Sequence, residues 1–321
     1  MRGGDAGKLR ETLSWYFGSG WVQTHFAAIE VVAGDVVKEN FGMQEAAAEA
    51  VLGRTKLVLH AAADVRHYAK EQESININCQ GTARAIDVAA RAGARLAHIS
   101  TISVAGEHLL RGPERVIFRE EDAEIGQNWR DNVYVKGKFL AEKLVMDARR
   151  MGLDAQIFRV GRLVGRSTDG VFQRKPEGNA FYSFLRGALA LEVLPQSSAE
   201  APVEMTPVDE CAAAIVALLA AEPGVYHVFH PKAFTFHGLM ERLKGALPLV
   251  SDDVFERHLS QKMGEGASLR LAMLMDVWMR AKACPFSIQP SAERTVKALL
   301  GRGFAWKEID ARLVLAAFLS Q

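Results

Sequence analysis

Short apolar runs that alternate with longer segments of helical period constrain the fold of this chain more than any other feature. Brief apolar runs bounded by turn residues are typical of buried strands. When they alternate with helical segments, they predict a parallel sheet whose strands are joined by crossover helices. We therefore expect an α/β fold with a doubly wound parallel sheet. The runs lie at Ala28–Ala33, Leu57–Ala61, Leu96–Ser100, Ala155–Val160 and Tyr226–Phe229.

The segments between and after these runs have helical periodicity. Ser74–Ala92 predicts one long crossover helix that stops at Gly93. Thr206 and Pro207 predict an N-cap and a first helical residue before another helix. After Phe229 we expect helices and no further strands. These helices are expected at Phe234–Ala246, Asp252–Ser260, Ala267–Ala283, Ser291–Leu300 and Trp306–Leu319.

Charge and cysteine content exclude several classes of function. The 39 Lys and Arg residues nearly balance 38 Asp and Glu, which leaves a net charge of +1 and no broad basic field for nucleic acid. Cys79, Cys211 and Cys284 are widely spaced, so neither a disulfide framework nor a zinc site is expected, and a reduced, cytoplasmic setting fits. No apolar stretch is long enough for a membrane span. We expect a protein without metal, membrane or nucleic-acid partners.

Tyr134 and Lys138 form a Tyr-x-x-x-Lys motif at the start of an expected helix whose N-cap is Asp131 or Asn132. A spacing of four residues places both side chains on one helix face. A nearby ammonium stabilises a phenolate, so we expect Lys138 to lower the pKa of Tyr134 and make it a proton donor. Taken alone, the motif is more often an exposed tyrosine and a solvated lysine, so its sequence context decides whether it is catalytic.

That context is the strand that ends at Ser100 and Thr101, one crossover before Tyr134. A hydroxyl at the carboxyl end of a strand faces the ligand crevice of an open α/β sheet. Thr101 could therefore hydrogen-bond the substrate oxygen that Tyr134 protonates. The structural alternative is a threonine that only favours the strand or the turn.

Five motifs occur in an order that resembles the extended short-chain dehydrogenase/reductase superfamily. They are Gly34-Asp35, His60-Ala61-Ala62-Ala63, Asn78-x-x-Gly81-Thr82, Ser100-Thr101 and Tyr134-x-x-x-Lys138. Within it, "HISTISVAGE", "GQNWRDNVYVKGKFLAEKLV", "FRVGRLVGRSTDGVFQRKPEGNAFYSFLRG" and "VEMTPVDECAAAI" are similar to the terminal thioester reductase domains of non-ribosomal peptide synthetases and carboxylic acid reductases. The similarity runs from Arg2 to about Phe229.

The resemblance implies an NADPH site and its residues. Asp35 and Val36 would lie by the adenine, and Ala61, Ala62 and Ala63 would form the turn over the cofactor. Asn78 would brace the strand ends, Ser100 would lie beside the cofactor, and Lys138 would also hydrogen-bond the nicotinamide ribose.

Two arginines near the N-terminus suit the phosphate that distinguishes NADPH from NADH. Arg2 falls where the family has an arginine at the end of its second strand, and Arg10 lies one helix start later. A guanidinium fork matches a phosphate dianion, so both are expected to select NADPH. The alternative for a terminal arginine is that it is merely solvated.

The resemblance also implies a division of the chain and a reaction. Residues 1–230 would form the Rossmann-like NADP-binding domain, with a substrate-lobe insertion at about 166–205, and residues 231–321 a smaller helical subdomain that faces substrate and carrier. The expected reaction is reductive release of an acyl or peptidyl thioester from a phosphopantetheinylated carrier protein as an aldehyde, with further reduction to the alcohol left open. Gln173, Asn179, Phe181 and Tyr182 would line the acyl channel, although aromatic residues at helical spacing are more often core.

One departure from the family keeps alternatives open. The family begins with a strand and a Gly-x-x-Gly-x-x-Gly turn that binds the cofactor pyrophosphate, and the sequence from Met1 has neither. We therefore expect an N-terminally truncated sheet and weak cofactor binding. The alternatives are a sugar-nucleotide epimerase or dehydratase on the same fold, and an inactive fragment or carrier-docking module.

Overall fold

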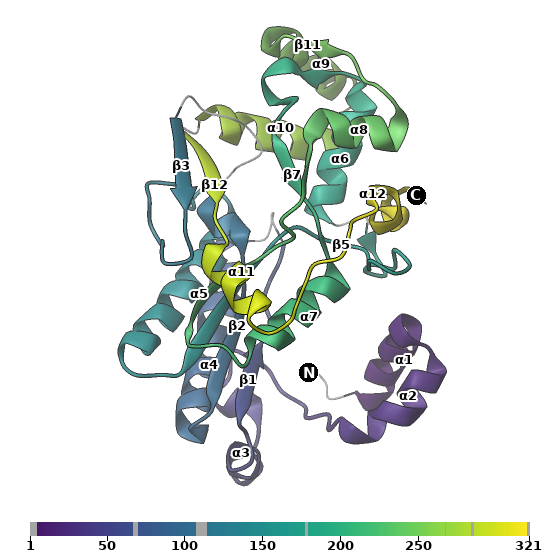
Figure 1. The fold of residues 1–321 in the computed structure, drawn as a ribbon. Coiled ribbons are helices and arrows are strands. Elements are labelled where there is room, and N and C mark those ends of the chain that lie inside the picture. The colour runs from purple at the N-terminus through teal and green to yellow at the C-terminus, as the bar shows by residue number, and fades with distance from the viewer. Residues whose placement is uncertain are drawn as a thin grey trace. The chain divides into compact units, whose positions relative to one another are not determined.

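The computed structural model describes residues 5–66, 70–106, 114–176, 179–266, 268–283 and 286–319. Arg2 lies outside these residues. The chain divides into two compact units. The first comprises residues 1–99 and 136–157, and the second comprises residues 100–135 and 158–321. Figure 1 shows the elements of both units, and each unit is described by itself.

A four-stranded sheet in the order β1-β2-β4-β9 carries the α/β fold that the sequence predicts. Its strands are β1 (Leu57–His60), β2 (Arg95–Thr101), β4 (Ala155–Val160) and β9 (Gly224–Val228). Strands β1 and β2 are parallel, with Leu57 opposite Arg95 and His60 opposite His98. Each of the four strands lies within two residues of its expected position.

Helices of the first unit pack beside these strands. The crossover helix α4 covers Glu71–Ala92 and stops at Gly93 in the left-handed conformation, as expected. Helix α5 (Val133–Arg150) continues from the second unit into the first. The buried side chains of α4 and α5 include Ala85, Val88, Phe139 and Val145. The remaining helical elements are α1 (Ala6–Phe17), α2 (Ser19–His25), η1 (Phe26–Ala28), η2 (Glu39–Gly42) and α3 (Glu45–Leu52).

The strand expected at Ala28–Ala33 does not form. Residues 26–28 make the short helix η1, and residues 29–34 are not part of any strand. A strand is stable only when a neighbour accepts its hydrogen bonds, and β1 is the last strand of the sheet on its side. Leu57 and Leu59 of β1 accordingly remain 37% and 52% exposed.

The second unit contains short paired strands as well as helices. Strand β12 (Phe286–Pro290) pairs in parallel with β3 (Glu114–Phe118), and β10 (Ala233–Thr235) pairs antiparallel with β7 (Pro202–Glu204). The expectation of no strand after Phe229 is therefore wrong. The other short pairs are β11 (Leu249–Val250) with β6 (Leu194–Pro195), and β5 (Leu163–Val164) with β8 (Thr206–Pro207).

Helices of the second unit enclose its main apolar core. Tyr182 and Leu185 of α6 are fully buried in this core. Gly187 permits the close approach of the neighbouring helix α10, because a Cβ there would lie 2.6 Å from the carbonyl oxygen of Arg270. The helices of this unit are η3 (Ile102–Ala105), α6 (Ala180–Leu191), η5 (Gln196–Ser198), α7 (Val208–Leu218), α8 (Phe236–Lys244), α9 (Asp252–Glu265), α10 (Leu269–Ala283), α11 (Glu293–Leu300), α12 (Ala311–Val314) and α13 (Ala316–Leu319).

The start of α7 differs by one residue from the sequence expectation. Pro207 is the N-cap, and Val208 is the first helical residue. Thr206 does not cap the helix, because its hydroxyl hydrogen-bonds Glu204 and accepts from the backbone N–H of His230.

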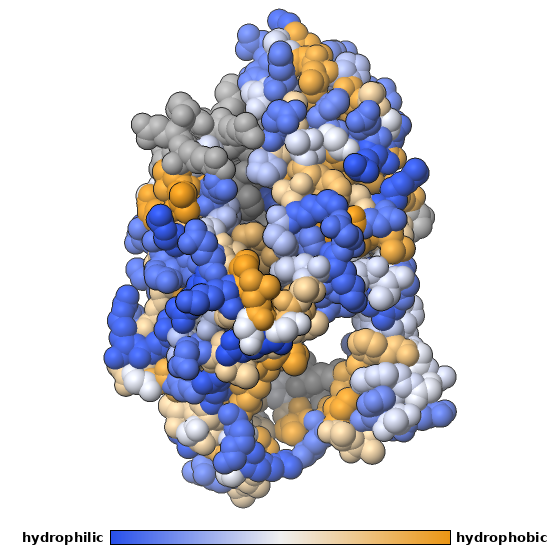
Figure 2. Space-filling view, viewed as in Figure 1, coloured by the Kyte–Doolittle hydropathy of each residue, from blue (hydrophilic) through white to orange (hydrophobic). Residues whose placement is uncertain are grey.

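The visible surface in Figure 2 is largely hydrophilic with scattered hydrophobic patches. No helix in the described part of the chain combines the length and apolar character needed to cross a membrane.

Candidate active site

Tyr134 lies in the first turn of α5, which begins at Val133. Asn132 caps this helix, because its side-chain oxygen accepts from the backbone N–H of Val135 at 3.1 Å. This resolves the sequence alternative of Asp131 or Asn132. Tyr134 hydrogen-bonds Thr101, the last residue of β2. The structure therefore brings together the two hydroxyl groups that the sequence predicts as donors to a substrate oxygen.

Burial controls the acidity of Tyr134. Desolvation of the half-buried phenol raises its pKa, and the hydrogen bond from Thr101 partly offsets this effect. The expectation that Lys138 lowers the pKa of Tyr134 is therefore wrong in direction. The phenol stays protonated at neutral pH, which is the form that donates a hydrogen bond.

Lys138 lies one turn further along α5 and is 5% exposed. Its ammonium group donates a hydrogen bond of 2.8 Å to the carbonyl oxygen of Ile99. Burial lowers the pKa of Lys138 to about 8, and Glu142 opposes this shift. Lys138 therefore titrates close to the physiological range.

Two buried histidines accompany Lys138 in the first unit. His60 and His98 are opposite each other on β1 and β2, and their ring centroids are 5.3 Å apart. Burial, followed by the charge of Lys138, lowers the pKa of His60 to about 4 and that of His98 well below its ordinary value. Both imidazoles are therefore neutral at pH 7, and Lys138 carries the positive charge.

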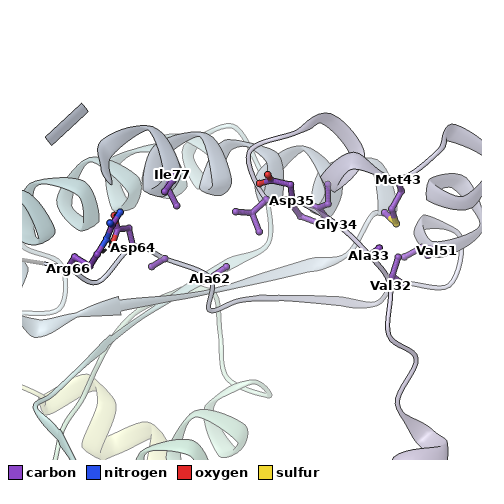
Figure 3. Close-up of a pocket in the computed structure, with 13 residues that line it drawn as sticks. Val32, Ala33, Gly34, Asp35, Met43, Val51, Ala62, Asp64, Arg66 and Ile77 are labelled. Carbon is purple, nitrogen blue, oxygen red and sulfur yellow. Dashed lines mark hydrogen bonds and ion pairs between the residues drawn. The ribbon is translucent and has the colours of Figure 1, made fainter. Parts of the chain in front are cut away.

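A cavity of about 580 Å³ lies in the first unit beyond the carboxyl end of β1. Figure 3 shows Arg66 and Asp64 together at one end, Asp35 between the ends, and Met43 and Val51 at the other end. The volume is in the range of sites for small molecules and cofactors. The lining residues are Val32, Ala33, Gly34, Asp35, Val36, Phe41, Met43, Val51, Ala62, Ala63, Asp64, Arg66 and Ile77.

Asn78 of α4 holds the loop that follows β1. Its side-chain oxygen accepts from the backbone N–H of Asp64 at 2.8 Å, and its amide nitrogen donates to the carbonyl oxygen of Asp64 at 3.1 Å. Gly137 of α5 makes room for this side chain, because a Cβ there would lie 2.6 Å from Asn78 Nδ2. Asn78 thus fixes one wall of the cavity.

The structure brings some of the predicted cofactor residues together and separates others. Asp35, Val36, Ala62 and Ala63 line the cavity. Ser100 is buried on β2 next to Thr101. The cavity lining does not include Ala61 or Arg10 among the described residues.

Arg10 has a different contact in the structure. Its guanidinium lies over the ring of Phe26, 4.3 Å from the centroid. The contact gives the exposed guanidinium an aromatic partner within the first unit.

The four predicted substrate residues have local contacts in the second unit. Asn179 caps α6 by accepting from the backbone N–H of Tyr182. Tyr182 is fully buried and packs against Phe172 and Phe318. Gln173 donates to the carbonyl oxygen of Lys175, and Phe181 is partly buried beside the core. Their role in an acyl channel stays a prediction.

Sequence reasoning missed several residues around the predicted site. Asp64 and Arg66 line the cavity, and Glu142 and His98 accompany Lys138. A position just after a parallel strand was the available signal for Asp64 and Arg66, because such loops form ligand crevices. The described residues contain no cluster of three or more His, Cys, Asp or Glu that could hold a metal ion.

The fold, together with the tyrosine and lysine of α5, places the chain among nicotinamide-dependent oxidoreductases with a Rossmann-like sheet. Residues 2–215 match the model of an NAD-binding family described as male sterility protein, and the chain belongs to that family.

Relatives and solved structures agree with the resemblance seen in the sequence. A linear gramicidin synthase polypeptide of Brevibacillus parabrevis is 28% identical over 242 residues, which are 74% of this chain and 5% of that much longer protein. A thiolation-reductase di-domain of an archaeal non-ribosomal peptide synthetase has a TM-score of 0.81 at 24% identity, and the match covers 100% of this chain and 68% of that one. The terminal R domain of the myxalamid PKS-NRPS pathway has a TM-score of 0.80 at 25% identity, with 100% and 82% covered. The similarity to peptide-synthetase reductase domains is confirmed.

Proposed function

We propose that this chain is an NADPH-dependent thioester reductase, which releases an acyl or peptidyl chain from a carrier protein as an aldehyde. The observation that carries the proposal is the hydrogen bond between Thr101 and Tyr134 at the start of α5, with Lys138 one turn later on the same helix. Membership of the NAD-binding family and similarity to peptide-synthetase reductase domains support the same reaction class.

The cavity of the first unit fits the nucleotide part of the cofactor. Its apolar end, around Met43 and Val51, offers a surface for the adenine ring, and its charged end offers hydrogen-bonding groups. Asp35 and Ala62 would contact the nucleotide between these ends, and Ala63, which also lines the cavity, would contact it as well. Bound NADPH supplies the hydride.

A preference for NADPH over NADH rests on the two arginines near the N-terminus. Arg10 would release Phe26 and bind the 2′-phosphate together with Arg2. Because a fork of N–H donors on a phosphate is a strong, charge-assisted contact, neutralising either arginine should weaken NADPH binding and spare NADH.

Thr101 and Tyr134 would act on the carbonyl oxygen of the thioester. Addition of hydride to the carbonyl carbon places negative charge on this oxygen, and two hydroxyl donors stabilise that charge. Tyr134 gives its proton to the oxygen, and a hemithioacetal results. Its collapse breaks the C–S bond, leaves the aldehyde and returns the pantetheine sulfur as a thiol, so one thioester, one hydride and one proton yield one aldehyde and one thiol. Lys138 would hydrogen-bond the nicotinamide ribose and supply positive charge along α5.

The carrier protein and the acyl chain would be recognised by the second unit. Residues 231–321 would form the helical subdomain that faces substrate and carrier, with residues 166–205 contributing to the same lobe. Gln173, Asn179, Phe181 and Tyr182 would border the acyl channel. The thiolation-reductase di-domain among the solved structures supports a carrier as the partner.

A single assay separates this function from the other candidates. The purified chain is mixed with NADPH and an acyl group loaded on a phosphopantetheinylated carrier. The decrease in NADPH absorbance and the formation of the aldehyde are then measured together. We expect consumption of NADPH that depends on the acyl carrier. Turnover of a nucleotide sugar without the carrier would favour an epimerase or dehydratase. Carrier binding without reduction would favour a docking module.

A further inference from the structure

One cation reaches the cavity of the first unit. Among the described residues that line the cavity, Arg66 is the one Lys, Arg or His. It follows β1 by six residues, and its side chain is 57% exposed, so a ligand can reach it. Figure 3 shows Arg66 at the end of the cavity that lies away from Met43 and Val51.

We propose that Arg66 binds the pyrophosphate of the dinucleotide cofactor, with Asp64 holding its guanidinium in place. This inference rests on the proposed function, because it takes the cofactor of that reaction as the ligand. It adds a binding residue that neither the sequence motifs nor the resemblance assigns.

Asp64 fixes the orientation of Arg66 through two parallel contacts. Nε of Arg66 donates to one carboxylate oxygen at 2.9 Å, and Nη2 donates to the other at 2.7 Å. The backbone of Asp64 is in turn held by Asn78. A guanidinium that is already ordered loses little freedom when it binds a ligand, which favours affinity.

Arg66 keeps two N–H donors that no described residue accepts from. Its hydrogen bonds to described residues come from the backbone N–H, Nε and Nη2, which leaves the two N–H groups of Nη1 available for a phosphate oxygen. Arginine suits this task because its fork presents several donors in one plane.

Nearby acids do not prevent an anion from binding there. Asp64 is 5% exposed and already neutralised by its paired contact with Arg66, which holds the pKa of its carboxyl below the ordinary value. Glu73 contacts Nη2 at 3.1 Å but is 53% exposed, and such a surface ion pair is weak enough for a phosphate to replace. Glu73 also lies in the first turn of α4, so the positive end of that helix dipole is close to the site.

The polarity of the cavity sets the direction of the cofactor. The base belongs at the apolar end, because Met43 and Val51 provide carbon surface there. The phosphates then fall toward Arg66, past Asp35 near the ribose. Arg66 would therefore bind a group that NADPH and NADH share, unlike Arg10, for which we propose the 2′-phosphate.

Binding to the intact chain tests this assignment. NADPH, NADH and ADP are titrated against the wild type, Arg66→Gln and the double variant Asp64→Asn/Arg66→Gln. The double variant avoids a buried carboxylate without its partner and guards against a simple folding defect. We expect Kd for NADPH and NADH to rise about ten- to hundredfold in both variants, because each variant loses one charge-assisted contact to the cofactor. Arg84→Gln, which removes a half-buried cation of α4 outside the cavity, should leave Kd unchanged.

The outcomes separate this inference from the proposed function. If the wild type binds NADPH and a folded double variant binds it equally well, the Arg66 assignment is wrong and the proposed function stands. Weakening of NADPH alone would also overturn it, because a pyrophosphate contact affects both cofactors. If the wild type binds ADP through Arg66 but neither dinucleotide, the phosphate site stands and the cofactor is wrong. Binding of none of the three ligands would overturn both.

Discussion

Replacing Gly137 with alanine should destabilise the protein, although alanine is the better helix former. In an open helix the exchange stabilises by about 1 kcal/mol. At Gly137 the new Cβ would lie 2.6 Å from Asn78 Nδ2 and 3.4 Å from Asn78 Cβ. Asn78 is 2% exposed and cannot retreat into solvent without leaving Asp64.

The hydrogen bonds of Asn78 determine how strongly Gly137→Ala destabilises the protein. Its displacement breaks both contacts to the Asp64 backbone, and buried polar groups left without partners cost about 1–3 kcal/mol each. If the surroundings relax in part, the lost hydrogen bonds of Asn78 cost about 2–4 kcal/mol of stability. The higher helix propensity of alanine returns about 1 kcal/mol, so the net destabilisation is about 1–3 kcal/mol.

Urea unfolding followed by circular dichroism measures this difference, and a double-mutant cycle isolates its cause. In an Asn78→Ala background the amide is gone, so Gly137→Ala should become neutral or stabilising. Gly264→Ala in α9, where a Cβ meets nothing within 4 Å, is the matched control and should stabilise by up to about 1 kcal/mol. Equal effects of Gly137→Ala in both backgrounds would refute the steric argument.

Other predictions concern the site directly. Tyr134→Phe should slow turnover by about 10²-fold with little change in KM for NADPH, measured by steady-state kinetics, and unchanged kcat would contradict its role as proton donor. Thr101→Val should slow the same step, and Thr101→Ser should restore most of the rate. Because burial lowers the pKa of Lys138 to about 8, kcat/KM should fall as the pH rises through that value. Lys138→Arg should shift this fall in kcat/KM to higher pH, because arginine stays protonated. If the fall stays at the same pH in Lys138→Arg, another group causes it. Arg10→Gln should raise Kd for NADPH and spare NADH, and equal loss for both would give Arg10 a structural role.

The charge of Lys138 also affects stability. Its pKa of about 8 in the folded protein lies below the ordinary 10.5, so the folded state binds fewer protons between these values. The contribution of this group to the free energy of unfolding therefore rises with pH across that window. Activity and stability should thus change in opposite directions above pH 8.

Strand β4 was predictable from the sequence because it is buried on both faces. The run Ala155–Val160 coincides with β4, whose six residues are all buried. A mostly apolar run, here interrupted by the buried Gln156 and Arg159, carries this information without any knowledge of neighbours. The run Ala28–Ala33 has similar composition, but a strand also needs a partner, and sequence pattern cannot report one.

The sequence motifs predicted which residues meet in the candidate site, but they did not predict the pKa of Tyr134. Tyr134 and Thr101 meet as expected because a helix start and a strand end are both marked in the sequence. The pKa of Tyr134 moves opposite to expectation because desolvation depends on the packing around the ring. Arg66 and Asp64 carry no periodic signal, so only the folded loop reveals their pairing.

Transfer of deuterium from NADPH labelled at the hydride position tests the central claim most directly. The chain is incubated with the labelled cofactor and an acyl group on a phosphopantetheinylated carrier, and the released product is analysed by mass spectrometry. We predict one deuterium at the aldehyde carbon, with the amount reduced about 10²-fold for Tyr134→Phe at equal times. Release of the carboxylic acid, or of an aldehyde without deuterium, would contradict reductive release by this chain.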